Sequence, residues 1–293
     1  MDDALLQCAG VASLAVVDLT LALCCGLLWT GIWLPRAEIR LPRIAWPAAA
    51  LIAGLCARFY VLTATMVQDA RPAAVFAGAS GVAATHAGAM TVWSLAAACV
   101  VLVANLGSRR AAAWPAWVMA APLVALLALH AGMGHAADSG NFTLDELWQF
   151  MHLAAMATWA GSVMAAGFFA APRLFAATSQ LDAAYLRKLS WASTWSVVVV
   201  VLSGSARAWT GLDGHLGNLL PSRWGWILLA KLTLVCVALA LGYLHRRAIH
   251  GPGRWTVEKS RWLVGTMRIE AACLAIVLVL SAWLGSADLP GSM

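Results

Sequence analysis

Histidine and methionine recur together near the ends of hydrophobic segments, at a spacing that could bring both side chains onto one metal ion. His86 precedes Met90 by four residues, and His152 precedes Met156 by the same step. Residues four apart lie on one face of a helix. Between the two pairs, the run HAGMGH supplies three more candidate ligands, which are His130, Met133 and His135. Thioether and imidazole together suit Cu(I), so these residues predict a copper ion as the bound metal.

The elements that must position these ligands are membrane helices. The chain is 62% hydrophobic and only 11% charged, whereas a soluble domain is about a quarter charged. Apolar stretches of about 20 residues, enough to cross a bilayer, recur along it. We therefore expect an all-α polytopic membrane protein, one integral domain over residues 1–293 surrounded by membrane lipid. Its bundle of about eight transmembrane helices is expected near 5–34, 46–67, 86–106, 114–131, 146–171, 188–210, 224–245 and 262–286.

Lysine and arginine gather in alternate connections, which predicts the orientation of the bundle. The basic set comprises Arg36, Arg40, Arg43, Arg109, Arg110, Arg173, Arg187, Lys188, Arg246, Arg247, Arg254, Lys259 and Arg261. The positive-inside rule places this set in the cytoplasm and both termini outside. All the candidate metal ligands then fall on the outer side, while His245 and His250 are assigned to a basic cytoplasmic loop. The net charge of +6 is interpreted as a topogenic signal, and no nucleic-acid partner is expected.

Charged residues inside the expected spans form a second group of candidates. Asp18, Glu270 and Lys231 lie within apolar segments, where charge is costly and usually faces the bundle interior. One interpretation is an ion or proton path through these three residues. The alternative is a set of structural ion pairs, with Lys231 and Arg207 reaching toward the outer interface.

The segment near 146–171 combines ligands with a packing motif. Ala157, Gly161 and Ala165 repeat a small residue every four positions, which permits close helix approach, and Pro172 is expected to end the helix. Of the seven cysteines, the adjacent Cys24 and Cys25 allow two interpretations. They are either small buried hydrophobic residues or a deeper stopping place for Cu(I).

This segment also carries a family resemblance. LWQFMHLAAMATWAGSVMAAG resembles the H-L-x-A-x-x-x-W-x-G helix of the copper resistance protein D (CopD) family, with His152, Trp159 and Gly161 matching. Further on, WGWILLAKLTLVCVALALGYLHRR resembles that family's y-G-x-x-L-x-K helix, with Gly225 and Lys231 as its glycine and lysine. The resemblance is best over residues 146–247.

The resemblance implies an eight-helix inner-membrane protein of copper homeostasis, with a periplasmic CopC-like copper-binding protein as partner. In such a membrane, the outside location given to both termini by the charge pattern is the periplasm. It also marks His152 as the central metal ligand. We expect copper to be bound at the periplasmic face and moved across the membrane. No catalytic role is assigned, and no nucleotide-binding motif GxxxxGK[ST] is present. Two alternatives remain open: a b-type haem redox protein with His86, His130 and His152 as candidate ligands, and a copper sensor or scaffold without transport.

Overall fold

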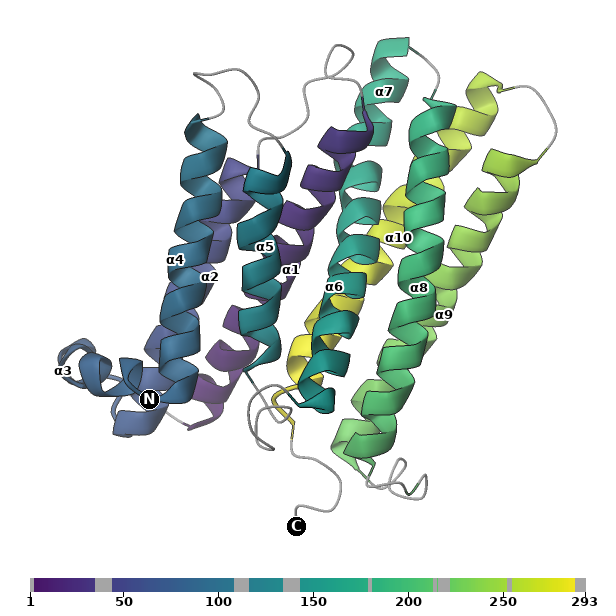
Figure 1. Ribbon diagram of the computed structural model, residues 1–293. Coiled ribbons are helices and arrows are strands. Elements are labelled where there is room, and N and C mark those ends of the chain that lie inside the picture. The colour runs from purple at the N-terminus through teal and green to yellow at the C-terminus, as the bar shows by residue number, and fades with distance from the viewer. Residues whose placement is uncertain are drawn as a thin grey trace.

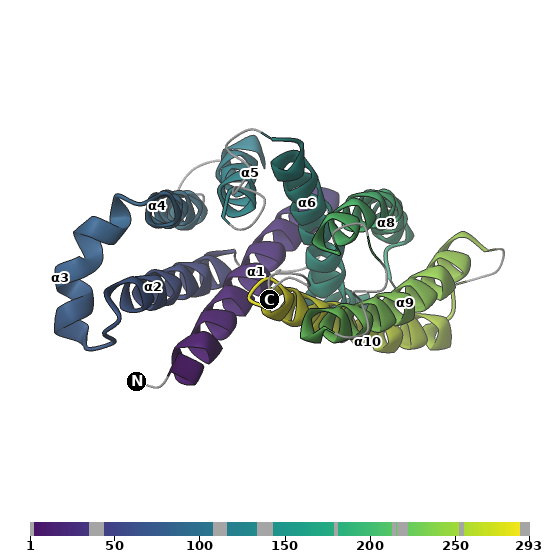
Figure 2. The same cartoon turned by 90° about the horizontal axis from the view of Figure 1, so that it is seen from below.

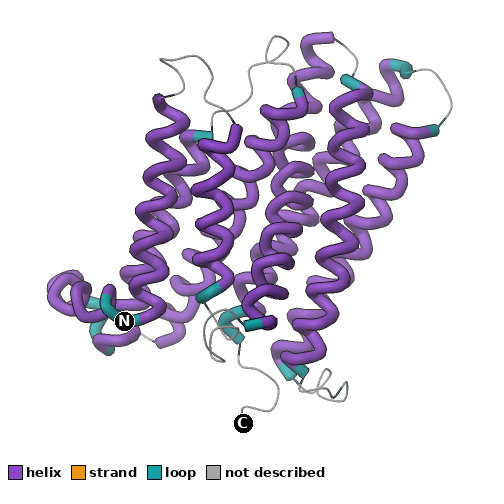
Figure 3. The backbone as a smooth tube through the Cα atoms, viewed as in Figure 1, coloured by secondary structure: helices purple, strands orange, loops and turns teal. Residues whose placement is uncertain are grey.

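A computed structural model of the chain describes residues 3–34, 44–107, 116–133, 143–178, 181–212, 215, 222–251 and 255–287. Every regular element in these residues is a helix (Figures 1 and 3), so the expected all-α class is confirmed. The elements are α1 (Asp3–Trp33), α2 (Ala45–Val67), α3 (Pro72–Ala83), α4 (His86–Gly107), α5 (Ala116–Ala131), α6 (Leu144–Met164), the π-helix η2 (Ala165–Ala170), α7 (Ala171–Thr178), α8 (Ala183–Gly211), α9 (Arg223–His250) and α10 (Val257–Leu284).

The long helices lie side by side and alternate in direction, as a polytopic membrane bundle requires (Figure 1). Seven helical stretches in the described residues are long and apolar enough to cross a membrane, and α6, η2 and α7 together form one of them. The expected span at 114–131 corresponds to α5, which runs between α4 and α6. Its 16 residues rise only about 24 Å, which is less than the hydrocarbon thickness of about 30 Å. The expected number of about eight spans is therefore reached only if the short helix α5 is counted as a span.

The surface of the bundle is apolar where a soluble protein would be polar. Trp93, Val103 and Leu202 are 64%, 67% and 61% exposed. Scattered exposed hydrophobic residues are normal, but large apolar side chains on every long helix indicate a lipid-facing surface.

Helix α1 crosses the middle of the bundle at a tilt and packs against α2, α5, α6 and α10 (Figure 2). Its contact with α6 is very close. A Cβ atom on Gly161 would collide with the backbone carbonyl of Ala22, and one on Gly26 would collide with the carbonyl of Gly161. The small-residue seam predicted around Gly161 is thus the contact of α6 with α1.

Pro172 does not end its helix, contrary to the sequence expectation. The chain continues through it to Thr178, after a π-helical stretch at Ala165–Ala170. Proline lacks the N–H that an α-helix needs and clashes with the preceding turn. A wider π-turn immediately before the proline relieves that conflict, which is a recognised way for helices to adjust.

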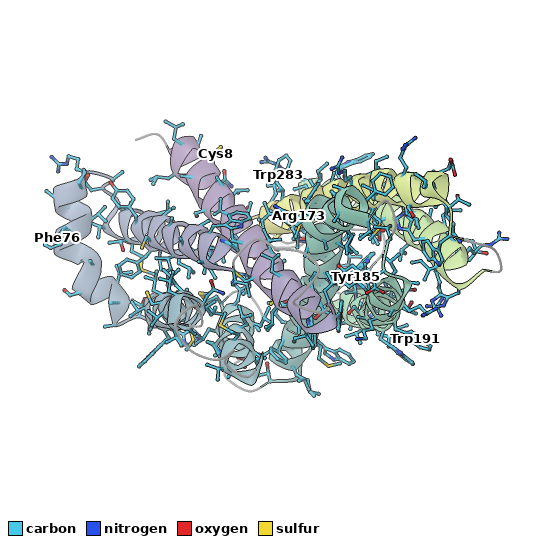
Figure 4. All side chains as sticks on the ribbon, turned by 90° about the horizontal axis from the view of Figure 1, so that it is seen from above. Cys8, Phe76, Arg173, Tyr185, Trp191 and Trp283 are labelled. Atoms are coloured by element: carbon cyan, nitrogen blue, oxygen red, sulfur yellow. The ribbon has the colours of Figure 1, made fainter. Side chains whose placement is uncertain are left out.

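Two other features were not predicted. Helix α3 begins with Pro72 at its first turn and lies across the outer ends of α2 and α4 (Figure 1). Its Phe76 is 86% exposed and projects at the rim of the molecule (Figure 4). Helix α9 continues to His250, so His245 lies inside a helix and is buried, and its assignment to a cytoplasmic loop was wrong.

Candidate metal site

The start of α4 and the end of α5 meet on the outer side of the bundle, and this meeting brings candidate ligands together. His86 is the first residue of α4, and its Nε2 lies 3.1 Å from the backbone oxygen of Gly132. A carbonyl oxygen only accepts hydrogen bonds, so Nε2 carries the proton. In the neutral ring the lone pair is therefore on Nδ1. One residue beyond Gly132, the Met133 sulfur lies 3.6 Å from the Thr91 hydroxyl of α4.

A groove of about 550 Å³ runs between α4 and α5 from this point. His86, Met90 and Glu146 line its outer part. Its remaining lining is apolar and mostly small: Trp93, Ala96, Ala97, Val100, Ala125, Ala128, Leu129 and Gly132. The groove thus has an imidazole and a thioether in its outer part, and mostly small side chains of α4 and α5 along the rest.

His130 lies at the same end of α5 but turns inward, toward α1. Its Nε2 is 2.9 Å from Asp18 Oδ1, and the two side chains are only 11% and 12% exposed. The other ring nitrogen, Nδ1, is buried and has no hydrogen-bond partner in the described part of the chain. His130 had been expected at the outer mouth. The tilt of α1 instead brings Asp18, fifteen residues into that helix, against the end of the short α5.

His152 occupies a different place in the bundle. Its Nδ1 lies 3.1 Å from the Ser203 hydroxyl of α8, and Ser203 itself donates to the Val199 carbonyl at 2.6 Å. Ser203 therefore accepts from Nδ1–H, which leaves the lone pair on Nε2. The absence of a side chain at Gly204 makes room for the ring. Met156, one turn deeper, is buried in the main core.

The predicted ligands therefore fall into separate groups. His86, Met90 and Met133 lie at the α4–α5 contact. His130, at the same end of α5, contacts Asp18 of α1. His152 contacts α8, and Met156 is buried in the main core. His135 lies outside the described residues. No group of three histidine, cysteine or acidic side chains suited to a metal occurs in the residues that the structure describes. The side chains that the described residues bring together at the α4–α5 contact are an imidazole and two thioethers, which suit a soft ion such as Cu(I).

The haem alternative requires two imidazoles facing one slot. Each candidate ring instead has a partner of its own: Gly132 for His86, Asp18 for His130 and Ser203 of α8 for His152. The described geometry therefore does not favour a haem between them. The adjacent thiols of Cys24 and Cys25 are buried in the core of α1.

The intramembrane charges also have partners. Asp18 interacts with Arg58 and Lys231 as well as with His130. Glu270 Oε2 lies 2.8 Å from Nδ1 of the buried His245. The sequence alone did not single out His245 as the partner of Glu270, although a carboxylate within a span requires a partner and that requirement could have pointed to it.

Comparison with protein families gives a match over the last three helices. Residues 183–284 match the family model described as copper resistance protein D. The chain is therefore similar to the copper resistance protein D family over this part. The CopD match covers about a third of the chain, namely α8, α9 and α10. It includes Ser203, Lys231, His245 and Glu270.

The CopD match over α8–α10 and the seven candidate spans support a multi-pass inner-membrane protein. The family match overlaps the expected region of resemblance at 183–247, but it leaves out α6 and therefore His152. Comparisons with curated proteins and with solved structures gave no match.

Proposed function

We propose that the chain binds copper at its periplasmic face and moves it across the inner membrane. The observation that carries this proposal is the state of His130. Its Nε2 faces the Asp18 carboxylate, and its buried Nδ1 has no partner in the described residues. Histidines that bind metals typically donate their other ring N–H to a carboxylate, which fixes the tautomer and orients the lone pair toward the metal. A buried polar atom without a partner is otherwise costly.

His86 supports the same proposal through a different acceptor. Its proton is held by the Gly132 carbonyl, so Nδ1 is left as the ligand atom. Met90 lines the same groove, and Met133 lies at the same end of α5. These residues would take copper from the outer side in the groove and pass it to His130. A conducting path needs binding of only moderate strength at each site, because a tightly held ion cannot leave.

The donor on the outer side is proposed to be a periplasmic copper-binding protein of the CopC-like kind. His152 and Met156 remain proposed ligands of a second position, since His152 presents Nε2 as its lone pair. Asp18, Lys231 and Glu270 are proposed to form an ion path beside this route.

The test is Cu(I) binding by the purified protein in detergent, measured by competition with a chromophoric chelator under reducing conditions. His130→Ala and His86→Ala should each weaken binding, and the double variant should lose it. X-ray absorption should report nitrogen and sulfur neighbours around the bound copper. His250→Ala is the matched control, because that histidine is exposed at the cytoplasmic end of α9. Unchanged binding in the double variant would remove the α4–α5 site from the proposal.

A further inference from the structure

A second carboxylate–imidazole pair lies between α9 and α10, in the half of the bundle opposite the copper groove. His245 Nδ1 is 2.8 Å from Glu270 Oε2, and the two side chains are 8% and 5% exposed. His245 is five residues from the cytoplasmic end of α9. Ionisable side chains this deep in a membrane are costly and usually mark an ion or proton pathway.

Counting hydrogen atoms indicates that His245 Nδ1 and Glu270 Oε2 share one proton. The Thr266 hydroxyl donates to the Trp262 carbonyl at 2.9 Å, and His245 Nε2 lies 2.8 Å from the same hydroxyl oxygen. Since Thr266 has one proton to give, His245 must donate to it from Nε2. The contact between Nδ1 and Oε2 then needs another proton, on either the imidazole or the carboxyl group. In both forms the pair is neutral as a whole.

Loss of that proton would leave two lone-pair atoms facing each other and a net negative charge inside the membrane. Such a state is unfavourable in a medium of low dielectric constant unless a positive charge arrives at the same time. Release of the proton is therefore linked to the position of a cation in the bundle.

The other charged groups around the pair are engaged elsewhere. Arg246 donates to Thr194 of α8 and lies over Trp191, which projects at the rim of the molecule (Figure 4). Three further cations on packed elements also point away from the pair. Arg247 lies over Tyr243, Arg173 donates to the Phe169 carbonyl, and Arg268 is exposed on another face of α10. On the cytoplasmic side of α8, the buried Tyr185 hydroxyl contacts Thr30 of α1.

The two carboxylate–imidazole pairs are joined through α1. This helix carries Asp18 and packs against both α5 and α10, so it touches the helices of both pairs. Lys231 of α9 interacts electrostatically with Asp18, which adds a link from α9 to the outer pair. A cation that binds at His130 therefore acts on helices that also position Glu270.

We propose that the His245–Glu270 pair is the proton-binding site that couples proton movement to copper movement. One Cu⁺ enters the bundle as one proton leaves the pair, so the total charge inside the membrane is unchanged and no oxidation or reduction is involved. The coupling of proton and copper movement rests on the proposed copper function. The inference that His245 and Glu270 share a proton does not depend on it.

The first experiment needs no copper. Infrared difference spectroscopy of the purified protein during a pH titration should show a carboxyl or imidazolium signal that disappears in both Glu270→Gln and His245→Gln. The signal should persist in His250→Gln, the control histidine at the exposed end of the same helix. If the wild-type signal is unaffected by either substitution, the pair is not a titrating site and the inference is overturned.

The second experiment measures the coupling. Adding Cu(I) to weakly buffered protein in detergent should release about one proton per ion bound, seen with a pH indicator. Glu270→Gln should abolish this release and remove the pH dependence of copper affinity. In proteoliposomes, an imposed pH gradient should drive copper through the wild type but not through Glu270→Gln.

The two proposals fail in different ways. Copper movement that ignores the pH gradient, with equal proton release in both proteins, would overturn the coupling and leave the copper function intact. A wild type that binds no copper would overturn the copper function and the coupling together, and the infrared signal would still decide whether the pair shares a proton.

Discussion

The hydrogen-bond partner of each imidazole decides which ring nitrogen is left for a metal. Asp18 and the Gly132 carbonyl hold the Nε2 protons of His130 and His86, so both rings present Nδ1. Ser203 holds the Nδ1 proton of His152, so that ring presents Nε2. Three histidines that look alike in the sequence thus differ in the direction from which copper can approach.

Asp18 is expected to set the copper affinity of His130 without touching the metal. Asp18→Asn keeps an acceptor for Nε2–H but removes the negative charge that makes the ring a stronger ligand. Cu(I) affinity should fall by about 10- to 100-fold, measured by chelator competition. Glu258→Gln is the control, because it removes an exposed acid at the cytoplasmic start of α10. An equal loss in both variants would point to a general charge effect.

His152 is expected to contribute to transport as a ligand rather than by packing. His152→Ala should lower copper transport while membrane insertion and folding are retained. The substitution removes the contacts of the ring with Gly204 and Ser203 of α8. Ser203→Ala leaves the imidazole in place and removes only its acceptor, so its transport loss should be smaller. Transport is measured as copper entry into proteoliposomes. Wild-type transport by His152→Ala would reduce the residue to a packing role.

The sequence predicted the residue types of the outer site but not their partners. The four-residue steps reveal a shared helix face, and they contain no information about a residue on a distant helix. Asp18 and His130 are 112 positions apart and meet only because α1 is tilted and α5 is short. His245 was assigned to a loop because two arginines follow it, whereas its contact with Glu270 keeps it buried.

At the level of helices, hydropathy predicted where segments occur better than where they end. Each of the eight expected segments corresponds to a helix in its described residues, but α3 was missed because twelve residues are too few for a span. The helix was predicted to end at Pro172, because proline usually disrupts an α-helix. The π-turn before Pro172, which accommodates the proline, cannot be predicted from the proline alone. The close helix contact at Gly161 was predicted correctly, since small residues repeated every four positions allow two helices to approach closely.

The α1–α6 contact provides a test of this packing. Gly161→Ala adds one methyl group that meets the Ala22 backbone, which cannot move aside as a side chain can. We expect a loss of about 1–3 kcal/mol in the free energy of unfolding, or more, seen as a lower midpoint of thermal unfolding in detergent. Gly265→Ala in α10 is the matched control, because no atom lies within 4 Å of its new Cβ. Equal stability of the two variants would contradict the close contact.

At the level of the whole molecule, charge and fold agree on one arrangement. The described ends of the helices that adjoin the basic connections lie together on one side of the bundle, and the start of α4 and the end of α5 lie on the other (Figure 1). The positive-inside rule then assigns the groove between α4 and α5, with its proposed copper ligands, to the periplasm. The fold alone has no sidedness, so this assignment depends on the lysine and arginine pattern of the sequence.

Accessibility of single cysteines tests that assignment and, with it, the side from which copper enters. In a variant without the seven native cysteines, a membrane-impermeant thiol reagent added to intact spheroplasts should label Ser139→Cys and leave Gly251→Cys unlabelled. Position 251 follows α9 directly at the end that carries Arg246 and Arg247, so it should react only after the membrane is permeabilised. Labelling at 251 in sealed spheroplasts would invert the bundle. His86, Met90 and Met133 would then face the cytoplasm, and the proposed path would run from inside to outside.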